Sequence, residues 1–109
     1  MKEPILMKDL LRQIDKALDN KIRFTIMAHL VHKKNATFNE MKALLGATDG
    51  NLSSNASILQ EKKYIEVNKT FSKKKPLTTY VITDLGKVAF KSHVEALGKI
   101  IQGKYDTKA

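Results

Sequence analysis

Residues 44–65 read LLGATDGNLSSNASILQEKKYI, and this stretch decides how the chain folds. The leucine pair closes a short apolar-periodic segment that predicts a helix over about 39–45, buried through Met41, Leu44 and Leu45. Gly46 follows where a helix needs a left-handed terminating residue, and Thr48 or Asp49 can cap a new helix. Two short helices joined by a tight turn that contains glycine are typical of a helix-turn-helix.

The second of these helices has one apolar and one polar side. Helical spacing places Leu52, Ala56 and Leu59 inward, and the outward side holds Asn51, Ser53, Ser54, Ser57, Ile58 and Glu61. Small polar residues let a helix approach the major groove of DNA closely, and asparagine suits adenine. The N-terminal end of the helix also offers backbone N–H groups to a phosphate. The alternative is the solvated face of an ordinary surface helix.

After residue 63 the apolar period changes from that of a helix to that of a strand. Residues 64–71 alternate between apolar and polar, and residues 78–82 are short, β-branched and aromatic, so both stretches predict strands. Residues 72–76, Ser-Lys-Lys-Lys-Pro, are predicted to form the hairpin loop, with Pro76 where the ladder requires no donor. A helix-turn-helix followed directly by a hairpin is a winged helix.

Positive charge is concentrated on this hairpin. The chain has 20 Lys and Arg against 11 Asp and Glu, a formal net charge of +9, and six of the lysines lie between Lys62 and Lys75. Lys73, Lys74 and Lys75 repel one another at the predicted tip and add nothing to the stability of the hairpin. Beside DNA, each phosphate contact would release counterions and add affinity. The alternatives are a charge run that protects a sheet edge or a generally solubilising basic surface.

Three further helices are predicted outside this central part. They cover about 5–18, about 20 to 33–35, and about 84–102. Asn20 is the expected N-cap of the second, and Thr83 or Asp84 that of the third. Residues from 103 onward are expected to fray. Helices followed by an antiparallel hairpin indicate an α+β class, here mostly α: a winged helix-turn-helix with flanking N- and C-terminal helices. We expect one domain over 1–109 with its core at about 15–98.

The first and last helices each carry an apolar stripe. One interpretation is that both stripes complete the core of a single chain. The other is that they pair with a second copy, because a two-fold dimer would place two such domains on two half-sites of DNA. The residues predicted for dimerisation are Leu6, Leu10, Leu11, Ile14, Leu18, Val94, Leu97 and Ile101.

Residue patterns for catalysis and metal binding are scarce. The chain has no cysteine, and its three histidines, His29, His32 and His93, lack the further ligands that a zinc site needs. There is no G-x-S-x-G motif and no glycine-rich phosphate loop, so we expect no enzyme activity and no cofactor. No apolar run is long enough to span a bilayer and the N-terminus does not resemble a signal peptide, which favours a cytoplasmic protein without a membrane partner.

The sequence resembles the single-domain winged-helix regulators related to the MarR and ArsR families over about residues 15–98. The resemblance is strongest in 44–53 with 59–65 and in 74–80 with 82–86, and it extends to Asp15, Ile22-Arg23-Phe24 and Ile26. It implies a recognition helix at about 49–62, a wing at about 71–78, and homodimerisation through the terminal helices. Such sequences usually have glycine where this chain has Lys63, and a left-handed lysine there would cost about 1 kcal/mol. The cysteine ligands of metal-sensing relatives are absent, so metal sensing is not implied.

These observations predict a sequence-specific regulator of transcription that binds double-stranded DNA, with the recognition helix in the major groove and the basic wing on the backbone or minor groove. The predicted DNA contacts are Asp49, Gly50, Asn51, Ser53, Ser54, Ser57, Ile58, Lys62, Lys73, Lys74, Lys75 and Thr78. Two hypotheses compete: a protein-interaction module, which requires an apolar exposed face on this helix, and a non-specific architectural DNA-binding protein. A small-molecule effector between the dimer helices is compatible with the sequence, but no residue indicates a particular ligand.

Overall fold

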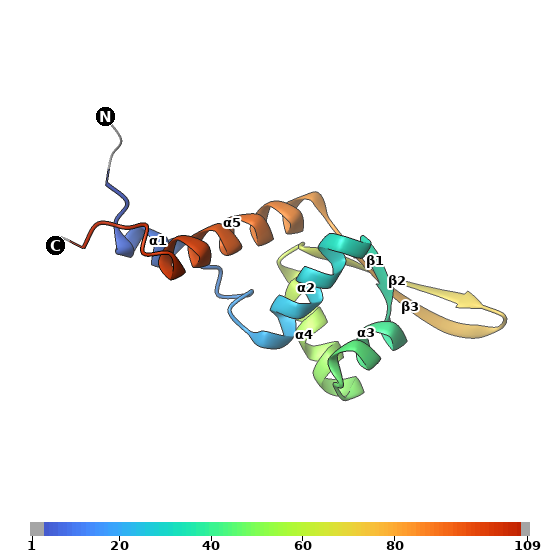
Figure 1. Cartoon of the computed structure of the whole chain (residues 1–109). Coiled ribbons are helices and arrows are strands. Elements are labelled where there is room, and N and C mark those ends of the chain that lie inside the picture. Colours follow the sequence, from blue (N-terminus) through green and yellow to red (C-terminus); the bar gives the residue numbers. More distant parts are fainter. Residues whose placement is uncertain (1–3, 108–109) are drawn as a thin grey trace.

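The computed structural model describes residues 4–107 and shows an elongated molecule of 61 × 24 × 21 Å (Figure 1). Its elements are α1 (Met7–Gln13), α2 (Lys21–Lys33), β1 (Asn35–Thr37), α3 (Phe38–Leu45), α4 (Asp49–Glu61), β2 (Ile65–Ser72), β3 (Lys75–Ile82) and α5 (Asp84–Ile101). The β2–β3 hairpin projects from one end, and α1 lies against the far part of α5 at the other. The predicted class, mostly helical with a winged helix-turn-helix and flanking helices, is confirmed.

The predicted helix starts and stops are set by local hydrogen bonds. Asn20 Oδ1 accepts from the backbone N–H groups of Ile22 and Arg23, both at 3.0 Å, and starts α2. Thr48 Oγ1 accepts from Asn51 N at 3.1 Å and starts α4. Gly46 ends α3 in the left-handed region with φ of 61°. These caps were predicted from residue type alone because each needs only a side chain and the backbone next to it.

The first helix is shorter than the apolar spacing predicts. It ends at Gln13, and residues 15–19 form a turn in which Asp15 Oδ1 accepts from Ala17 N at 2.9 Å. The backbone N–H of Asp15 donates to His93 Nδ1 on α5, also at 2.9 Å, which ties the turn to α5. Asp15 competes with the helix by bonding its own neighbouring backbone. The prediction of a continuous helix over 5–18 was therefore wrong.

The core lies between α2, α3, α4 and the sheet. Its buried side chains are Leu18, Ile26, Met27, Leu30, Ala36, Met41, Leu52, Ala56, Leu59, Ile65, Tyr80 and Ile82. Leu10 is also buried, where α1 packs on α5. Leu10 and Leu18 thus complete the core of the single chain, which corrects their assignment to a dimer interface. Leu44, expected to be buried, is exposed.

The sheet has a third strand that the sequence pattern did not predict. β1 pairs antiparallel with β3, with Asn35 opposite Val81 and Ala36 opposite Tyr80, so β3 is central in the order β1-β3-β2. A strand of three residues is too short to show alternation, and it forms because the chain leaves α2 at Lys34 with φ of 69° and meets β3.

The hairpin is longer and its turn tighter than predicted. Ser72 pairs with Lys75 and Phe71 with Pro76, so three of the five predicted loop residues belong to strands. Only Lys73 and Lys74 form the turn, with φ of 52° and 65°. Two consecutive positive φ values define the mirror-image type I turn, whose twist matches that of the strands. Pro76 lies beyond the part of β3 that β1 covers.

The end of the chain does not fray where the loss of apolar pattern predicts it. Asp106 N donates to Ile5 O at 2.7 Å, and Leu6 and Asp106 form a parallel bridge. The expectation of fraying from residue 103 was therefore wrong for the part up to Thr107. In this same described range, none of the helices combines the length and apolar character that crossing a bilayer requires.

Candidate nucleic-acid interface

α4 presents a polar face to solvent while its other side is held in the core. The predicted inward residues Leu52, Ala56 and Leu59 are buried. The predicted contact residues on the helix are all exposed: Asp49, Gly50, Asn51, Ser53, Ser54, Ser57 and Ile58. Lys62 is exposed as well and forms the C-cap. The amphipathic prediction for α4 is confirmed, and the exposed polar side faces outward from the helix-turn-helix.

A chain of hydrogen bonds fixes α4 to α2 and orients Asn51. Arg23 Nε donates to Ala17 O at 2.6 Å, and Arg23 Nη1 donates to Asn55 Oδ1 at 2.7 Å. Asn55 Nδ2 in turn donates to Asn51 Oδ1 at 2.7 Å and to Asn51 O at 2.9 Å. The side-chain Nδ2–H groups of Asn51 make no hydrogen bond within residues 4–107 and therefore remain free to donate, whereas its backbone N–H is bonded to Thr48 Oγ1. Sequence reasoning missed Arg23 and Asn55 because they are 32 positions apart.

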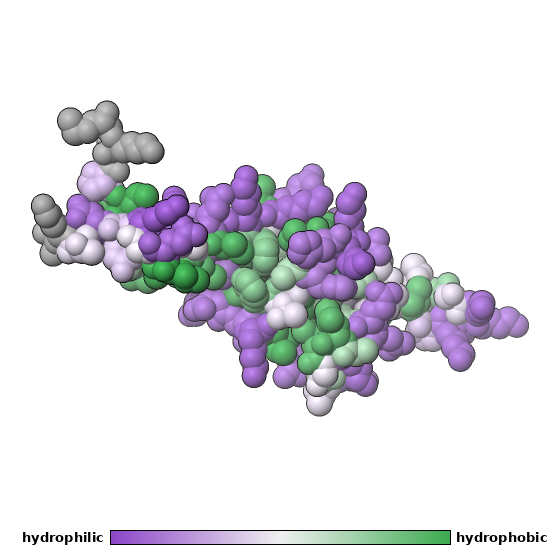
Figure 2. All heavy atoms as spheres, in the orientation of Figure 1, coloured by the Kyte–Doolittle hydropathy of each residue, from purple (hydrophilic) through white to green (hydrophobic). Residues whose placement is uncertain are grey.

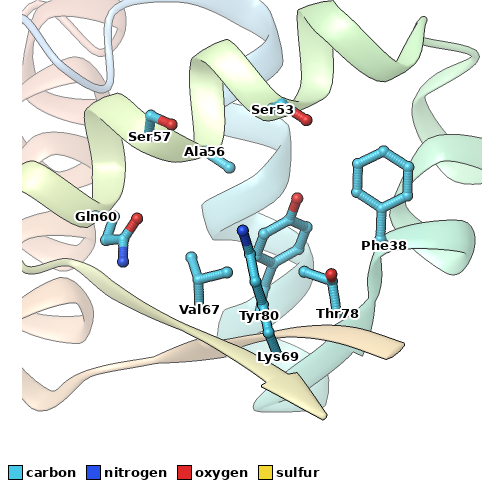
Figure 3. Close-up of a pocket in the computed structure, with 9 residues that line it drawn as sticks. All are labelled: Phe38, Ser53, Ala56, Ser57, Gln60, Val67, Lys69, Thr78 and Tyr80. Atoms are coloured by element: carbon cyan, nitrogen blue, oxygen red, sulfur yellow. The ribbon is translucent and has the colours of Figure 1, made fainter. Parts of the chain in front are cut away.

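The three serines of the exposed face are not equivalent. Ser54 Oγ donates to Gly50 O at 2.8 Å, one turn back in the helix, so its proton is already used. Ser53 and Ser57 have no such bond in the described part of the chain, and both lie on the side of α4 that faces the hairpin (Figure 3). Ser53 and Ser57 are thus better placed to donate to an external acceptor than Ser54 is.

The N-terminal end of α4 carries an acid that is already neutralised. Asp49 Oδ1 lies 2.6 Å from Lys42 Nζ on α3. An isolated carboxylate at this position would repel a phosphate, and the ion pair reduces that repulsion. A Cβ at Gly50 would meet no atom within 4 Å, so the backbone there is open to close approach.

The hairpin tip is exposed and almost entirely polar. Lys73, Lys74 and Lys75 are exposed, and Phe71 beside them is 78% exposed. Figure 2 shows hydrophilic side chains over the end of the hairpin, whereas hydrophobic side chains gather near α1 and the end of α5. The three lysine side chains make no ion pair or hydrogen bond within the described part of the chain, so the tip is a basic projection.

A groove of about 430 Å³ separates α4 from the hairpin (Figure 3). The strand pairs Val67–Tyr80 and Lys69–Thr78 form its floor. It is lined by Phe38, Ser53, Ala56, Ser57, Gln60, Val67, Lys69, Thr78 and Tyr80. Thr78 was predicted as a contact, but Lys69, Gln60 and Tyr80 were not. The alternation that places Lys69 on the same face as Val67 was the signal that could have found it.

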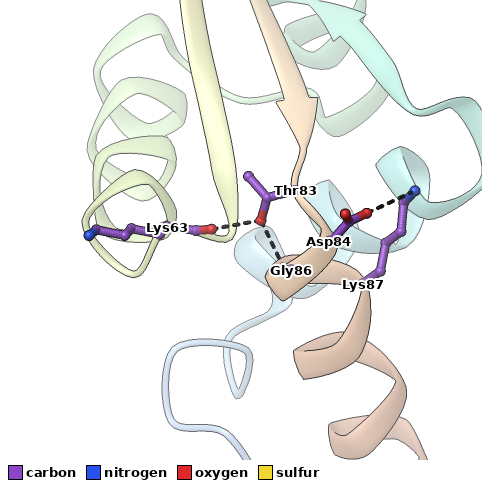
Figure 4. Close-up of polar contacts among 5 residues, drawn as sticks. All are labelled: Lys63, Thr83, Asp84, Gly86 and Lys87. Atoms are coloured by element: carbon purple, nitrogen blue, oxygen red, sulfur yellow. Dashed lines mark hydrogen bonds and ion pairs between the residues drawn. The ribbon is translucent and has the colours of Figure 1, made fainter.

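The junction between α4, the hairpin and α5 is locked by Thr83 (Figure 4). Thr83 Oγ1 donates to Lys63 O at 2.6 Å and accepts from Gly86 N at 2.9 Å, so one hydroxyl ties the end of α4 to the start of α5. A Cβ at Gly86 would collide with the carbonyl oxygen of Tyr64. The hairpin therefore leaves the body of the molecule at a fixed angle to α4.

Lys63 adopts the left-handed conformation that its place in the sequence implies. Its φ is 63°. Lys63 N donates to Gln60 O at 2.9 Å and Tyr64 N donates to Leu59 O at 3.0 Å, which together form the Schellman motif that ends α4. The helix thus ends in the geometry expected of glycine, with a lysine in its place.

Tyr64 connects this junction to the turn after α1. Its hydroxyl donates to Asp15 Oδ2 at 2.5 Å. Burial, together with the hydrogen bond to Asp15 and the charge of that carboxylate, raises the pKa of Tyr64 from 10.0 to about 12. The phenol therefore stays protonated as a donor at neutral pH, and its role is structural.

The terminal helices keep part of their apolar surface exposed. Leu11 and Ile101 are 59% and 82% exposed, and Val94 is exposed as well, whereas Leu6, Ile14 and Leu97 are half-buried. Six of the eight residues predicted for dimerisation therefore retain surface that a second copy can cover. The described residues contain no group of three or more His, Cys, Asp or Glu side chains that could hold a metal ion.

Two sequence comparisons agree with this geometry. Residues 22–101 match the family model of a winged helix DNA-binding domain. An uncharacterized protein of Methanocaldococcus jannaschii is 34% identical over 79 residues, which cover 72% of this chain and 86% of that protein. The family match by itself includes all of α3, α4, the hairpin and α5.

Solved structures give the same result at the level of the fold. A transcriptional regulator homologue from Pyrococcus horikoshii superposes with a TM-score of 0.80 at 28% identity, over 89% of this chain and 94% of that one. A MarR family transcriptional regulator from Streptomyces coelicolor, solved in complex with DNA, superposes with a TM-score of 0.63 at 15% identity, over 93% of this chain and 69% of that one. The second likeness concerns the fold alone.

Proposed function

The chain belongs to the winged helix DNA-binding domain family, and we propose that it is a transcriptional regulator that binds double-stranded DNA in a sequence-specific way as a homodimer. One observation carries this proposal: the polar face of α4 and the lysine tip of the hairpin are separate, exposed projections joined by a rigid junction. Each has the chemistry for a different part of the double helix. The function is therefore binding, with no catalytic step.

We assign sequence reading to α4. Asn51, Ser53, Ser57 and Ile58 are exposed on it, and the donors of Asn51 are free while its oxygen is held by Asn55. A helix with small polar residues fits the major groove and reaches base edges there. Gly50, Ser54 and Lys62 lie at the ends or margins of this face and would contact the DNA backbone, and Asp49 lies beside them with its carboxylate paired to Lys42.

We assign positioning to the hairpin. Lys73, Lys74 and Lys75 would contact phosphates, which adds affinity without reading sequence. Thr78 lies further along the same hairpin, on the floor of the groove. Replacing the three lysines by alanine is expected to weaken binding to all duplexes alike and to reduce the salt slope by about 1 for each phosphate that a lysine no longer neutralises. Unchanged binding at every salt concentration would remove the hairpin from the interface.

We propose that two copies pair through α1 and α5. The support is the exposed apolar surface at Leu11, Val94 and Ile101, extended by the half-buried Leu6, Ile14 and Leu97. A two-fold dimer would present two α4 helices to two half-sites about one helical turn or a multiple of it apart. A DNA-binding regulator works beside the chromosome, so we assign the protein to the cytoplasm.

Selection of bound duplexes from a random DNA pool at moderate salt tests the proposal directly. We expect enrichment of an inverted repeat, which would reveal sequence preference and two-fold docking together. Binding without enrichment would support an architectural protein instead, and no retention even at low salt would favour a protein-interaction module. Ile101→Lys tests the proposed dimer, because it places a charge on the exposed apolar surface of α5. The variant should be a monomer that loses the preference for the inverted repeat and binds a single half-site more weakly.

A further inference from the structure

Tyr80 holds an unused hydroxyl at the floor of the groove between α4 and the hairpin. The residue is only 2% exposed, and its ring packs 6.4 Å from that of Phe38. Within residues 4–107 the hydroxyl makes no hydrogen bond, and it points toward α4 across the groove (Figure 3). The described residues hold no buried side-chain N or O atom without a partner, so this hydroxyl reaches the surface of the groove, where water or a ligand can pair with it. Burial raises the pKa of Tyr80, so the group keeps its proton and can donate.

The other polar groups around the groove form a donor set without an acid. Ser53, Ser57 and Thr78 supply hydroxyls and Lys69 supplies an ammonium group that extends toward α4 (Figure 3). Gln60 adds an amide, and none of these side chains is bonded elsewhere in the described range. No carboxylate lines the groove. One cation and several hydroxyls fit a compact anion with several oxygens, of which a phosphate group is the natural example.

This step rests on the proposed function. The position of the groove between α4 and the hairpin indicates that the phosphate belongs to the DNA backbone. If α4 enters the major groove and the hairpin tip lies on the neighbouring backbone or minor groove, the strand that divides the two grooves must cross between α4 and the hairpin. We propose that this groove is the seat of a backbone phosphodiester, with Lys69 as its charge partner and the hydroxyls of Thr78 and Tyr80 as donors. The seat would fix the register of α4 on the duplex.

Two single substitutions test the seat with little risk to the fold. Lys69→Gln removes one charge per protomer and should lower the salt slope by about 1 for each half-site. Tyr80→Phe removes only an oxygen atom and should lower affinity about two- to tenfold for every duplex. Matched controls lie at a distance: Lys91→Gln on α5 loses the same charge, and Tyr105→Phe loses the same oxygen. Both controls should bind as the wild type does.

A scan of neutral linkages identifies the phosphate itself. In the selected duplex, each phosphate in turn is replaced by an uncharged methylphosphonate, and affinity is measured for the wild type and for Lys69→Gln. We expect one position per half-site at which the neutral linkage lowers the affinity of the wild type about tenfold. At that position it should lower the affinity of Lys69→Gln little further. A separate titration tests whether the groove binds a free anion. Inorganic phosphate is added to DNA-free protein, the amide NMR signals of Ser53, Ser57 and Lys69 are followed, and chloride at equal ionic strength is the control.

The outcomes separate failure of the seat from failure of DNA binding. If Lys69→Gln and Tyr80→Phe match the wild type while the triple lysine variant of the tip is weakened, the seat is wrong and DNA binding stands. If the wild type retains no DNA, both proposals fall. Saturable shifts of these NMR signals at millimolar inorganic phosphate, together with competition between phosphate and DNA for the protein, would contradict the proposal. The groove would then bind a free phosphorylated ligand and not the DNA backbone.

Discussion

α4 and the β2–β3 hairpin are the two halves of the proposed interface, and they are supported in opposite ways. α4 is buried along one side by Leu52 and Leu59 and tied to α2 by Arg23 through Asn55. The hairpin tip projects from the body of the molecule (Figure 1), exposes Phe71, and carries two lysines with positive φ. A helix that reads bases must be held in register, whereas a basic projection needs only reach and charge. Substitutions should therefore affect stability in the first region and affinity in the second.

The largest expected difference in stability separates Leu52→Ala from Phe71→Ala. Removing the buried Leu52 side chain should lower the free energy of unfolding by about 2–5 kcal/mol, because it leaves a cavity under α4. Removing the exposed Phe71 side chain should change it by less than about 0.5 kcal/mol. Urea unfolding followed by circular dichroism measures both. Equal losses would mean that the tip is supported as firmly as α4.

The next largest effect is expected at the tie between α2 and α4. Arg23→Met should lower the free energy of unfolding by about 1–3 kcal/mol, because Asn55 Oδ1 and Ala17 O lose a charged donor. It should also broaden the base preference at the positions nearest Asn51, which selection from a random DNA pool would reveal. Arg12→Met is the control, since Arg12 is exposed on α1 and pairs with Asp9 of the same helix. A sharper selected motif in Arg23→Met would contradict the role assigned to this tie.

Stability and affinity should move in opposite directions at the hairpin turn. Replacing Lys73 by Asn and Lys74 by Gly supplies the residues that this turn type prefers and should raise the free energy of unfolding by about 1 kcal/mol. The same change removes two charges, so DNA affinity and the salt slope should fall. The double glutamine variant loses the same charges without the relief of strain. If the Asn-Gly variant is no more stable than the glutamine variant, the tip is not strained.

The smallest effect is expected where the two regions join. Lys63→Gly should raise the free energy of unfolding by about 0.5–1 kcal/mol, because glycine adopts a φ of 63° without the steric cost that lysine has. Gly46→Ala, at the equivalent end of α3, should lower it by a similar amount. Thermal unfolding of both variants under one condition gives the comparison. A destabilised Lys63→Gly would show that the lysine side chain contributes more than its conformation costs.

Local signals were enough to predict α4, its caps and the hairpin strands. Thr48, Gly46 and the alternation around Val67 act through neighbouring residues, so their effect is visible in the sequence. What could not be predicted depends on residues far apart. β1 needs β3 as a partner, and the Arg23–Asn55 bond spans two helices. Leu18 has helical spacing although it lies in the turn that begins at Asp15, which His93 ties to α5. The groove residues Lys69 and Tyr80 required the strand register as well.

The crowded contact of Gly86 with Tyr64 has a mechanical consequence. Because α5 begins beside Tyr64, just after the end of α4, with no space for even one methyl group between Gly86 and the Tyr64 carbonyl, α5 extends as an arm from this contact. The long arm, α5, has 18 residues and is about 27 Å long at 1.5 Å per residue. In the dimer that we propose, a change in how the two copies pack at the far end of α5 would reach the end of α4 through this contact. The spacing between the α4 helices of the proposed dimer would thus depend on packing at the end of the molecule furthest from the wing.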